Sequence, residues 1–350
     1  MPTSILGLDI GGANLKAATP DKRAISVPFP LWKQPDKLPA ALAELVAKFP
    51  DAEELAITMT GELCDCFETK RDGVHAIIAA TRFASAGRRI RVWSTDGAFV
   101  DSEEAKRDHL KVASANWHAL ATFAGRYVPE GRTILIDVGS TTTDIIPILD
   151  GKPVPEGKTD HDRIFTRELL YTGVRRTPVC ALLGWNGTAE FFATTLDVYL
   201  TLGMIPENMA DTDTADGRPA TKAHARARLC RMLGGDAETV AVENIKSLVE
   251  GLYEQQRDRI QYCEAIVRSR LETMPSSRMP GYATNPELDE LSAGDRVTYI
   301  VSGAGEFLAR RAACLLDEPG EDISLTDRLG PAVSACAPAY AVAVLATESR

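Results

Sequence analysis

Two stretches of this chain share one pattern of apolar and polar positions: an apolar run, an acidic residue, a glycine-led polar turn and a second apolar run. The stretches are Ile5–Lys16 and Ile134–Leu149. Unbroken apolar runs of this length predict buried strands, and a polar turn containing glycine between two of them is typical of a β-hairpin. Asp9 aligns with Asp137, so the pattern indicates a duplicated unit with one hairpin in each copy.

Further strands and helices are predicted around the two hairpins. Apolar residues form short continuous runs in some windows and recur at helical spacing in others. Strands are predicted at 55–59, 89–93 and 297–301, and helices at 38–49, 112–127, 220–233, 240–271 and 330–346. This mixture of elements indicates the α/β fold class.

Length and composition narrow the classes of function. A chain of 350 residues has room for two domains. The net charge of −10 argues against general nucleic-acid binding, which requires a basic surface. No apolar run has the length of a membrane span, and the N-terminal stretch does not have the pattern of a secretory signal. Seven scattered cysteines are typical of a reduced compartment, so we expect a cytoplasmic protein without a membrane partner.

The two predicted turns carry the candidate chemistry. Glycine lets the backbone approach a ligand, and successive N–H groups of a turn can bind an anion. Asp9, Asp137 and Asp144 are candidate ligands of Mg²⁺, which bridges carboxylates to phosphate. Lys16 stands where the second copy has Asp144, which suits two turns that hold one phosphate group from opposite sides. The predicted phosphate-binding residues are Gly11, Gly12, Asn14, Lys16, Gly139, Ser140, Thr141, Thr142 and Thr143.

Two candidate positions lie outside the turns. Asp96 follows a predicted strand, where an acid is well placed for catalysis in an α/β fold, although acids are also common in turns. Arg175 and Arg176 stand between Gly173 and Pro178. Arginine presents a planar fork that can bind a carboxylate or phosphate through two hydrogen bonds, so the pair is a candidate substrate clamp; a surface basic pair is the alternative.

Together with a third segment, the turns resemble the phosphate loops of the actin, hexokinase and Hsp70 superfamily. The third segment is Tyr299–Glu306, which resembles the superfamily's adenosine loop and makes Gly303, Ala304, Gly305 and Glu306 candidate substrate-binding residues. The resemblance implies a duplicated, ribonuclease H-like fold of two domains around a central cleft. The expected domains are 1–130, with 330–350 packing near or across to it, and 131–350, with a mostly helical insertion at about 150–298.

Within this superfamily the chain resembles the hydantoinase/oxoprolinase-like branch. More narrowly, it is similar to the tetrahydromethanopterin-linked C1 transfer pathway proteins, whose archaeal relatives resemble the synthase of methanofuran and methylofuran biosynthesis. That synthase joins an aminomethylfuran-methyl diphosphate to γ-glutamyltyramine. The segments that carry this resemblance are Thr60–Leu63, Lys70, Asp137–Pro147 and Tyr171–Pro178.

The resemblance implies a transferase that uses Mg²⁺ and small-molecule substrates. A phenol oxygen of the acceptor would displace pyrophosphate from the furan diphosphate, and Asp9, Asp96 or Asp137 would accept the phenolic proton. Two other classes stay open: an ATP-dependent kinase or hydantoinase/oxoprolinase-type hydrolase, and a non-enzymatic, actin- or chaperone-like nucleotide switch. ATP is therefore a possible but not a favoured cofactor, and a homodimer is a possible assembly.

Overall fold

The computed structural model describes residues 4–276, 297–313 and 322–349. A first sheet occupies the N-terminal part, with strand order β3-β2-β1-β4-β5-β6. Strands β1, β4 and β5 run parallel, and β1, β2 and β3 form an antiparallel meander. The strands are β1 (Ile5–Ile10), β2 (Asn14–Ala18), β3 (Ala24–Pro28), β4 (Glu54–Met59), β5 (Arg89–Trp93) and β6 (Phe99–Val100).

A second sheet repeats this arrangement. Its order is β10-β8-β7-β11-β12, with β7 and β8 antiparallel and β7, β11 and β12 parallel, and β9 adds to β8. The strands are β7 (Arg132–Val138), β8 (Thr143–Leu149), β9 (Lys152–Pro153), β10 (Leu169–Leu170), β11 (Thr298–Ser302) and β12 (Ile323–Ser324). Since β1 and β7 occupy equivalent places in the two sheets, the predicted duplication is confirmed.

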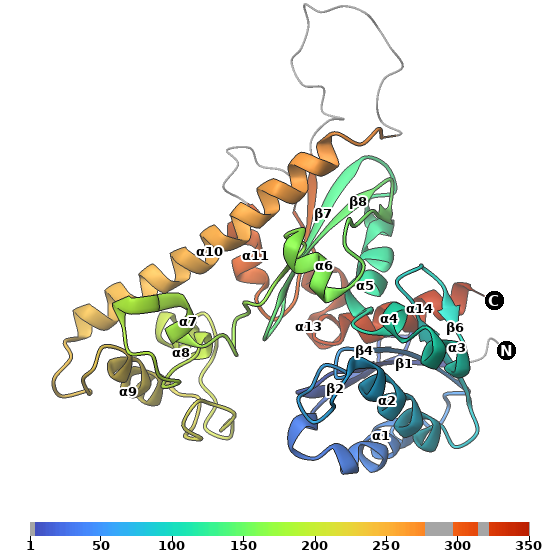
Figure 1. The fold of residues 1–350 in the computed structure, drawn as a ribbon, viewed down its shortest axis with the longest axis horizontal. Coiled ribbons are helices and arrows are strands. Elements are labelled where there is room, and N and C mark those ends of the chain that lie inside the picture. The colour runs from blue at the N-terminus through green and yellow to red at the C-terminus, as the bar shows by residue number, and fades with distance from the viewer. Residues whose placement is uncertain (1–3, 277–296, 314–321, 350) are drawn as a thin grey trace, which may run out of the picture.

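Helices form three layers around the two sheets (Figure 1). Helices α1 (Leu38–Ala47) and α2 (Lys70–Ala84) share an apolar core with the outer face of the first sheet. On the outer face of the second sheet, α11 (Glu306–Ala313) and the C-terminal half of α10 (Val242–Glu272) do the same. Between the sheets lie α5 (Asn116–Ala124) and α14 (Ala337–Glu348).

The C-terminal helix α14 packs tightly on the first sheet. A side chain at Gly7 of β1 would collide with the backbone of Ala339, so only glycine allows the helix to lie this close. The buried face of α14 is rich in alanine, which keeps the distance small. The C-terminal helix therefore covers the sheet formed by the N-terminal part of the chain (Figure 1).

The long helix α10 has two packing partners along its length. Its N-terminal half shares a core with α7 (Val179–Leu183), α8 (Thr195–Leu202) and α9 (Lys222–Met232), at the far end from the first sheet (Figure 1). Its C-terminal half covers the second sheet. The predicted helices at 220–233 and 240–271 are thus confirmed, but α10 belongs to the domain core as well as to the predicted insertion.

Two predicted helices are interrupted. The segment 330–346 forms α13 (Pro331–Ser334) and α14, which begins only at Ala337. The small-residue segment 112–127 was expected to be continuous, but α4 (His109–Val112) ends before it and α5 starts only at Asn116. Ser114 between them has φ +49°, a left-handed conformation that a helix cannot contain. The remaining short helices are α3 (Ser102–Arg107), α6 (Asp160–Phe165) and α12 (Leu325–Leu329). Among the described residues, no helix is long and apolar enough to cross a membrane.

Candidate functional site

Asp9 and Asp137 lie on the inner faces of the two sheets. In β1, Ile5 belongs to the core between the sheets, whereas Leu6 and Leu8 belong to the outer core. Side chains alternate along a strand, so Asp9 is on the inner side with Ile5. The same alternation in β7 places Asp137 on the inner side with Leu135. Each acid therefore stands near the end of its strand and faces the other half of the molecule.

The two turns after these acids have the same geometry. The Gly11 N–H donates to the Asn14 carbonyl oxygen at 3.0 Å, and the Gly139 N–H donates to the Thr142 carbonyl oxygen at 2.8 Å. Across the hairpins, Asp9 is paired in register with Lys16, and Asp137 with Asp144. The structure thus reproduces the alignment expected from the sequence, residue by residue.

Asp9 is a buried carboxylate with one unused oxygen. It is 5% exposed, and its Oδ1 has no hydrogen-bond partner among the described residues. Lys16 Nζ lies 3.8 Å from the other oxygen, Oδ2. Burial raises the pKa of Asp9, and the positive charge of Lys16 partly opposes this effect. An orphaned, buried carboxylate oxygen is a position that a cation would satisfy.

Asp137 experiences the charges of both hairpins. Burial, and then the neighbouring charge of Asp144, raise the pKa of Asp137 to about 7, while the positive charge of Lys16 lowers it and the charge of Asp9 raises it further. Lys16 and Asp9 belong to the first hairpin, so their influence on Asp137 means that the two hairpins share one electrostatic environment. The two carboxylates are hard oxygen donors that fit Mg²⁺.

Asp144, the third predicted metal ligand, has a different partner. Arg163 Nη2 donates to its Oδ1 at 2.8 Å, and the Arg163 side chain is 1% exposed. The guanidinium carbon of Arg163 also lies 3.9 Å from the ring centroid of Trp117 on α5. Metal binding by Asp144 would compete with this buried ion pair, which gives the residue a structural role that the sequence did not reveal.

The hydroxyl groups of the second turn divide into two groups. Ser140 and Thr141 are at least partly accessible, as phosphate donors must be. Thr143 is fully buried, and its hydroxyl donates to the Thr172 carbonyl oxygen at 2.7 Å, contrary to its predicted role on phosphate. The neighbouring Gly173 lies directly against the turn, because a side-chain carbon there would stand 2.6 Å from the Gly139 carbonyl oxygen.

The loop that resembles an adenosine-binding segment packs against β7. The Gly305 N–H donates to the Val138 carbonyl oxygen at 2.8 Å, and Gly303 has φ +90° and lies against Asp137. Glu306 accepts hydrogen bonds from Arg310 and from the hydroxyl of Ser324. These contacts tie Glu306 to its own domain, whereas Gly303 lies beside the Asp137 carboxylate and Gly305 packs against Val138 and Val174.

The two predicted arginines have different surroundings. Arg175 Nη2 donates to Asp211 Oδ1 at 2.7 Å, so the Arg175 guanidinium already forms an ion pair. Arg176 forms no ion pair with any described residue, and its guanidinium carbon lies 4.5 Å from the ring centroid of Trp32 in the first half of the chain. Its backbone N–H donates to the Ser140 carbonyl oxygen at 2.9 Å. Arg176 is therefore a free cation next to the second turn.

Asp96, the third candidate base, is an accessible carboxylate. Lys111 Nζ lies 2.7 Å from its Oδ2 and Lys158 Nζ lies 3.1 Å from its Oδ1. The hydrogen bonds to Lys111 and Lys158 lower the pKa of Asp96. A lowered pKa makes a weaker proton acceptor, so Asp96 is the least suitable of the three predicted bases.

A buried cluster joins the two halves; it includes Glu62 and Lys70, which belong to segments that carry the family resemblance but were not predicted to be site residues. Ser114 Oγ donates at 2.6 Å to Glu62 Oε1 and lies 2.8 Å from Asp160 Oδ2, which Lys70 Nζ contacts at 3.1 Å. Glu62 is 1% exposed, its Oε2 has no partner among the described residues, and burial raises its pKa to about 7. It follows the carboxyl end of β4, so the rule that selected Asp96 could also have found it.

Comparison with known proteins places this architecture in a family. The model of the family described as hydantoinase/oxoprolinase matches residues 53–349. The chain belongs to the hydantoinase/oxoprolinase family. This hydantoinase/oxoprolinase protein has a curated relative in Methanocaldococcus jannaschii. The relative is named (4-{4-[2-(gamma-L-glutamylamino)ethyl]phenoxymethyl}furan-2-yl)methanamine synthase. The two sequences are 34% identical, and the match covers 99% of this chain and 98% of the relative. A Methanococcus vannielii protein of the same name is 31% identical over 61% of this chain and 89% of its own length.

A solved structure supports the fold of this hydantoinase/oxoprolinase protein. A nucleotide-free structure of acetone carboxylase superimposes with a TM-score of 0.54 at 10% identity, covering 98% of this chain and 70% of that chain. At this identity the likeness concerns the fold alone. Together with the repeated strand order of the two sheets, it confirms the predicted actin-like, duplicated α/β fold.

Proposed function

We propose that this protein is a transferase of methanofuran-type cofactor biosynthesis, which joins an aminomethylfuran-methyl diphosphate to the phenol oxygen of a γ-glutamyltyramine acceptor. The observation that carries the proposal is the 34% identity to the curated synthase over nearly the whole length of both chains. That name describes a product in which a phenoxy group is attached to a furan methylene, so the reaction forms an aryl alkyl ether.

The chemistry is a displacement at the furan methylene carbon. The phenol oxygen forms a bond to this carbon while the bond between the carbon and the diphosphate oxygen breaks, and the diphosphate leaves with the bonding electrons. The furan ring delocalises positive charge that develops on the carbon. The residues proposed to hold the diphosphate are the backbone N–H groups of the two glycine turns, Lys16 and Arg176.

Asp9 and Asp137 are the residues proposed to hold Mg²⁺. They are the inward-facing carboxylates of the two hairpins, and Asp9 has an oxygen without a partner among the described residues. A bound Mg²⁺ would neutralise charge on the departing diphosphate. Among the described residues no cluster of three or more metal-binding side chains is found, so the proposal requires phosphate oxygens and water to complete the coordination.

The phenolic proton must pass to a base during the displacement. A free phenol has a pKa of about 10, and a base with a pKa near neutrality is efficient at physiological pH. Asp137 and Glu62 have pKa values raised to about 7, whereas the pKa of Asp96 is lowered. Since Asp137 is assigned to the metal, Glu62 joins the candidate bases, and Asp96 becomes the weakest of them.

Direct assay of the condensation tests the proposal. Purified protein, the furan diphosphate, γ-glutamyltyramine and Mg²⁺ should yield the ether, detected by mass spectrometry, together with one pyrophosphate for each ether formed. The reaction should proceed without ATP. Failure to form the ether, combined with phosphate release from ATP, would instead support the kinase, hydrolase or nucleotide-switch alternatives.

A further inference from the structure

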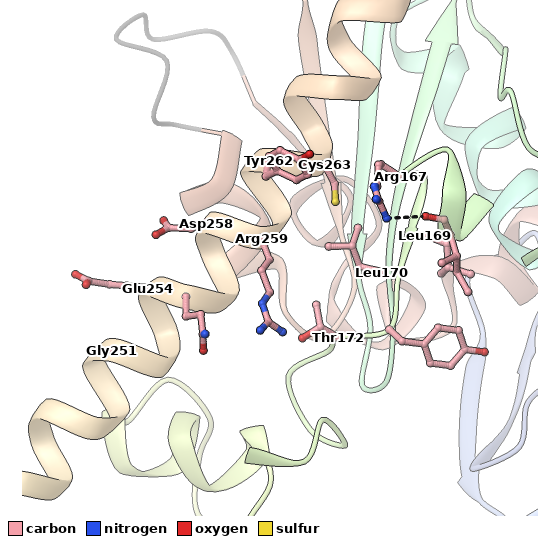
Figure 2. A pocket seen from close by; sticks show the side chains of 13 residues that line it. Arg167, Leu169, Leu170, Thr172, Gly251, Glu254, Asp258, Arg259, Tyr262 and Cys263 are labelled. Atoms are coloured by element: carbon pink, nitrogen blue, oxygen red, sulfur yellow. Dashed lines mark hydrogen bonds between the residues drawn. The ribbon is translucent and has the colours of Figure 1, made fainter. Parts of the chain in front are cut away.

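A cavity of about 790 Å³ opens in the second half of the molecule, apart from the two hairpins. It lies between α10 and the segment that contains the edge strand β10 (Figure 2). Leu169, Leu170 and Tyr171 form an apolar and aromatic wall, and α10 forms the opposite wall from Gly251 to Cys263. At 1.5 Å per residue, this helical wall is about 18 Å long, which suits an extended small molecule.

One wall of the cavity leads to a residue that packs against the second phosphate turn. Thr172 lines the cavity, and the next residue, Gly173, packs directly against the backbone of the turn at Gly139. Gln256 of α10 holds both residues in place, because its Nε2 donates to Thr172 Oγ1 at 2.8 Å and to the Gly173 carbonyl oxygen at 2.9 Å. A molecule in the cavity would therefore end close to the turn that is proposed to hold the diphosphate.

The cavity contains a positive charge that no carboxylate neutralises. Arg259 has no ion pair or hydrogen bond with any residue of the described ranges, and its side chain extends from α10 toward Thr172 (Figure 2). Glu254 and Asp258 line the same helical wall, and Asp258 is paired with Arg257. The cavity lining thus combines an apolar, aromatic wall with two guanidinium groups: Arg167, which donates to the Ile164 carbonyl oxygen, and Arg259, which has no partner among the described residues.

We propose that this cavity binds the acceptor, with the carboxylate of the γ-glutamyl group on Arg259 and the phenol ring against Leu169–Tyr171. The assignment rests on the proposed function, which requires a ligand with an anionic tail and an aromatic body. Arg175, the carboxylate clamp expected from the sequence, is occupied by Asp211. Arg259 has the same planar guanidinium group, and this group forms no ion pair with a carboxylate of the described residues.

Tyr171 lines the cavity and is influenced by the charges of the buried cluster between the two halves. Burial, followed by the charges of Asp160 and Glu62, raises the pKa of Tyr171 to about 12. The aromatic end of the cavity is therefore electrostatically close to Glu62, one of the candidate bases. An acceptor with its tail on Arg259 would direct its phenol toward this base and the neighbouring phosphate turn.

Kinetics with two acceptors tests the assignment. Arg259→Gln should raise the KM for γ-glutamyltyramine by about tenfold to hundredfold, as expected for loss of a charge-assisted hydrogen bond. The KM for the furan diphosphate should stay within about twofold, and so should the efficiency with tyramine, which lacks the γ-glutamyl carboxylate. Lys246→Gln removes an exposed positive charge from the same helix outside the cavity and should change neither constant.

The possible results distinguish a wrong cavity assignment from a wrong proposed function. If the wild type forms the ether but Arg259→Gln keeps the wild-type KM for γ-glutamyltyramine, the cavity assignment is wrong and the proposed function stands. If the wild type forms no ether, the proposed function is wrong. Calorimetric titration with γ-glutamyltyramine then tests whether the cavity binds this acceptor. Binding that weakens in Arg259→Gln but not in Lys246→Gln supports the assignment, and equal binding or no binding to the wild type refutes it.

Discussion

At the scale of single residues, burial gives identical side chains different proton affinities. Asp137 and Asp96 are both aspartates near the ends of strands, yet the pKa of the first is raised to about 7 and that of the second is lowered. The difference follows from the surroundings, because Asp137 is buried beside the acids of two hairpins whereas Asp96 is partly exposed and contacts Lys111 and Lys158. Residue type and position could be predicted from the sequence, but these opposite environments could not.

The raised pKa of Asp137 predicts a dependence of stability on pH. Between the unfolded pKa of 3.8 and the folded pKa of about 7, the folded state binds more protons than the unfolded state. Wild-type stability without metal should therefore fall as pH rises through this interval. Asp137→Asn removes this penalty and should melt at a higher temperature at pH 8, by an amount equivalent to roughly 4 kcal/mol at most. The gain should vanish near pH 4.

Scanning calorimetry without metal, with Asp96→Asn as the control, checks this expectation. Asp96 has a lowered pKa and is partly exposed, so its substitution should bring no gain at pH 8. Added Mg²⁺ should raise the melting temperature of the wild type but not of Asp137→Asn, and the variant should lose metal-dependent activity. Equal melting temperatures of wild type and Asp137→Asn at pH 8 would show that Asp137 carries no such penalty.

Substitution of the two neighbouring arginines should have different effects on the KM for the furan diphosphate. Arg176→Ala should raise the KM for the furan diphosphate by about tenfold to hundredfold, since it removes a free cation beside the second turn. Arg175→Ala is the matched control: its guanidinium is paired with Asp211, so both KM values should stay within about twofold. Equal effects of the two substitutions on the KM for the diphosphate would contradict this division.

At the scale of elements, apolar runs were the most informative part of the sequence. They predicted the hairpins and the strands at 55–59 and 297–301, because a strand buried on both faces leaves an unbroken apolar run. The prediction of a continuous helix at 112–127 was wrong, because Ser114 adopts a left-handed backbone conformation that cannot be predicted from a serine in the sequence. The partners of Thr143 and Arg175 come from segments distant in sequence, and no local pattern reports such contacts.

The contact between β1 and α14 predicts a strong effect at Gly7. Gly7→Ala introduces a side-chain carbon that collides with the backbone of Ala339, so the helix must move away from the sheet. Overpacking of this kind typically costs about 1–3 kcal/mol. Gly251→Ala in α10 is the control, because a side-chain carbon there meets no neighbouring atom and alanine favours the helix. Urea unfolding should show a loss for Gly7→Ala and none for Gly251→Ala; equal stability of Gly7→Ala and wild type would refute the contact.

At the scale of the whole molecule, two sheets and the helices between them hold the hairpins in position. The core that contains α5 and α14 includes residues of both sheets, such as Ile5 and Leu135. Asp9 and Asp137 lie on the same faces as these residues, so the packing that separates the sheets also sets the spacing of the acids. The duplication could be predicted from two matching motifs, whereas the cavity along α10 and the Glu62 cluster depend on contacts that form only in the folded chain.

Because α10 packs against two different parts of the molecule, residues that recognise the nucleophile can be changed separately from those that bind the leaving group. One half of this helix carries α7–α9 and the other covers the second sheet, and Gln256 stands where the cavity wall meets the phosphate turn. Under the proposed assignments, the leaving group and the nucleophile are recognised by separate segments that share only this junction. Cavity-lining side chains such as Leu170 and Arg259 are therefore the positions to exchange for other nucleophiles, with Gln256 kept so that the contact with the phosphate turn is preserved.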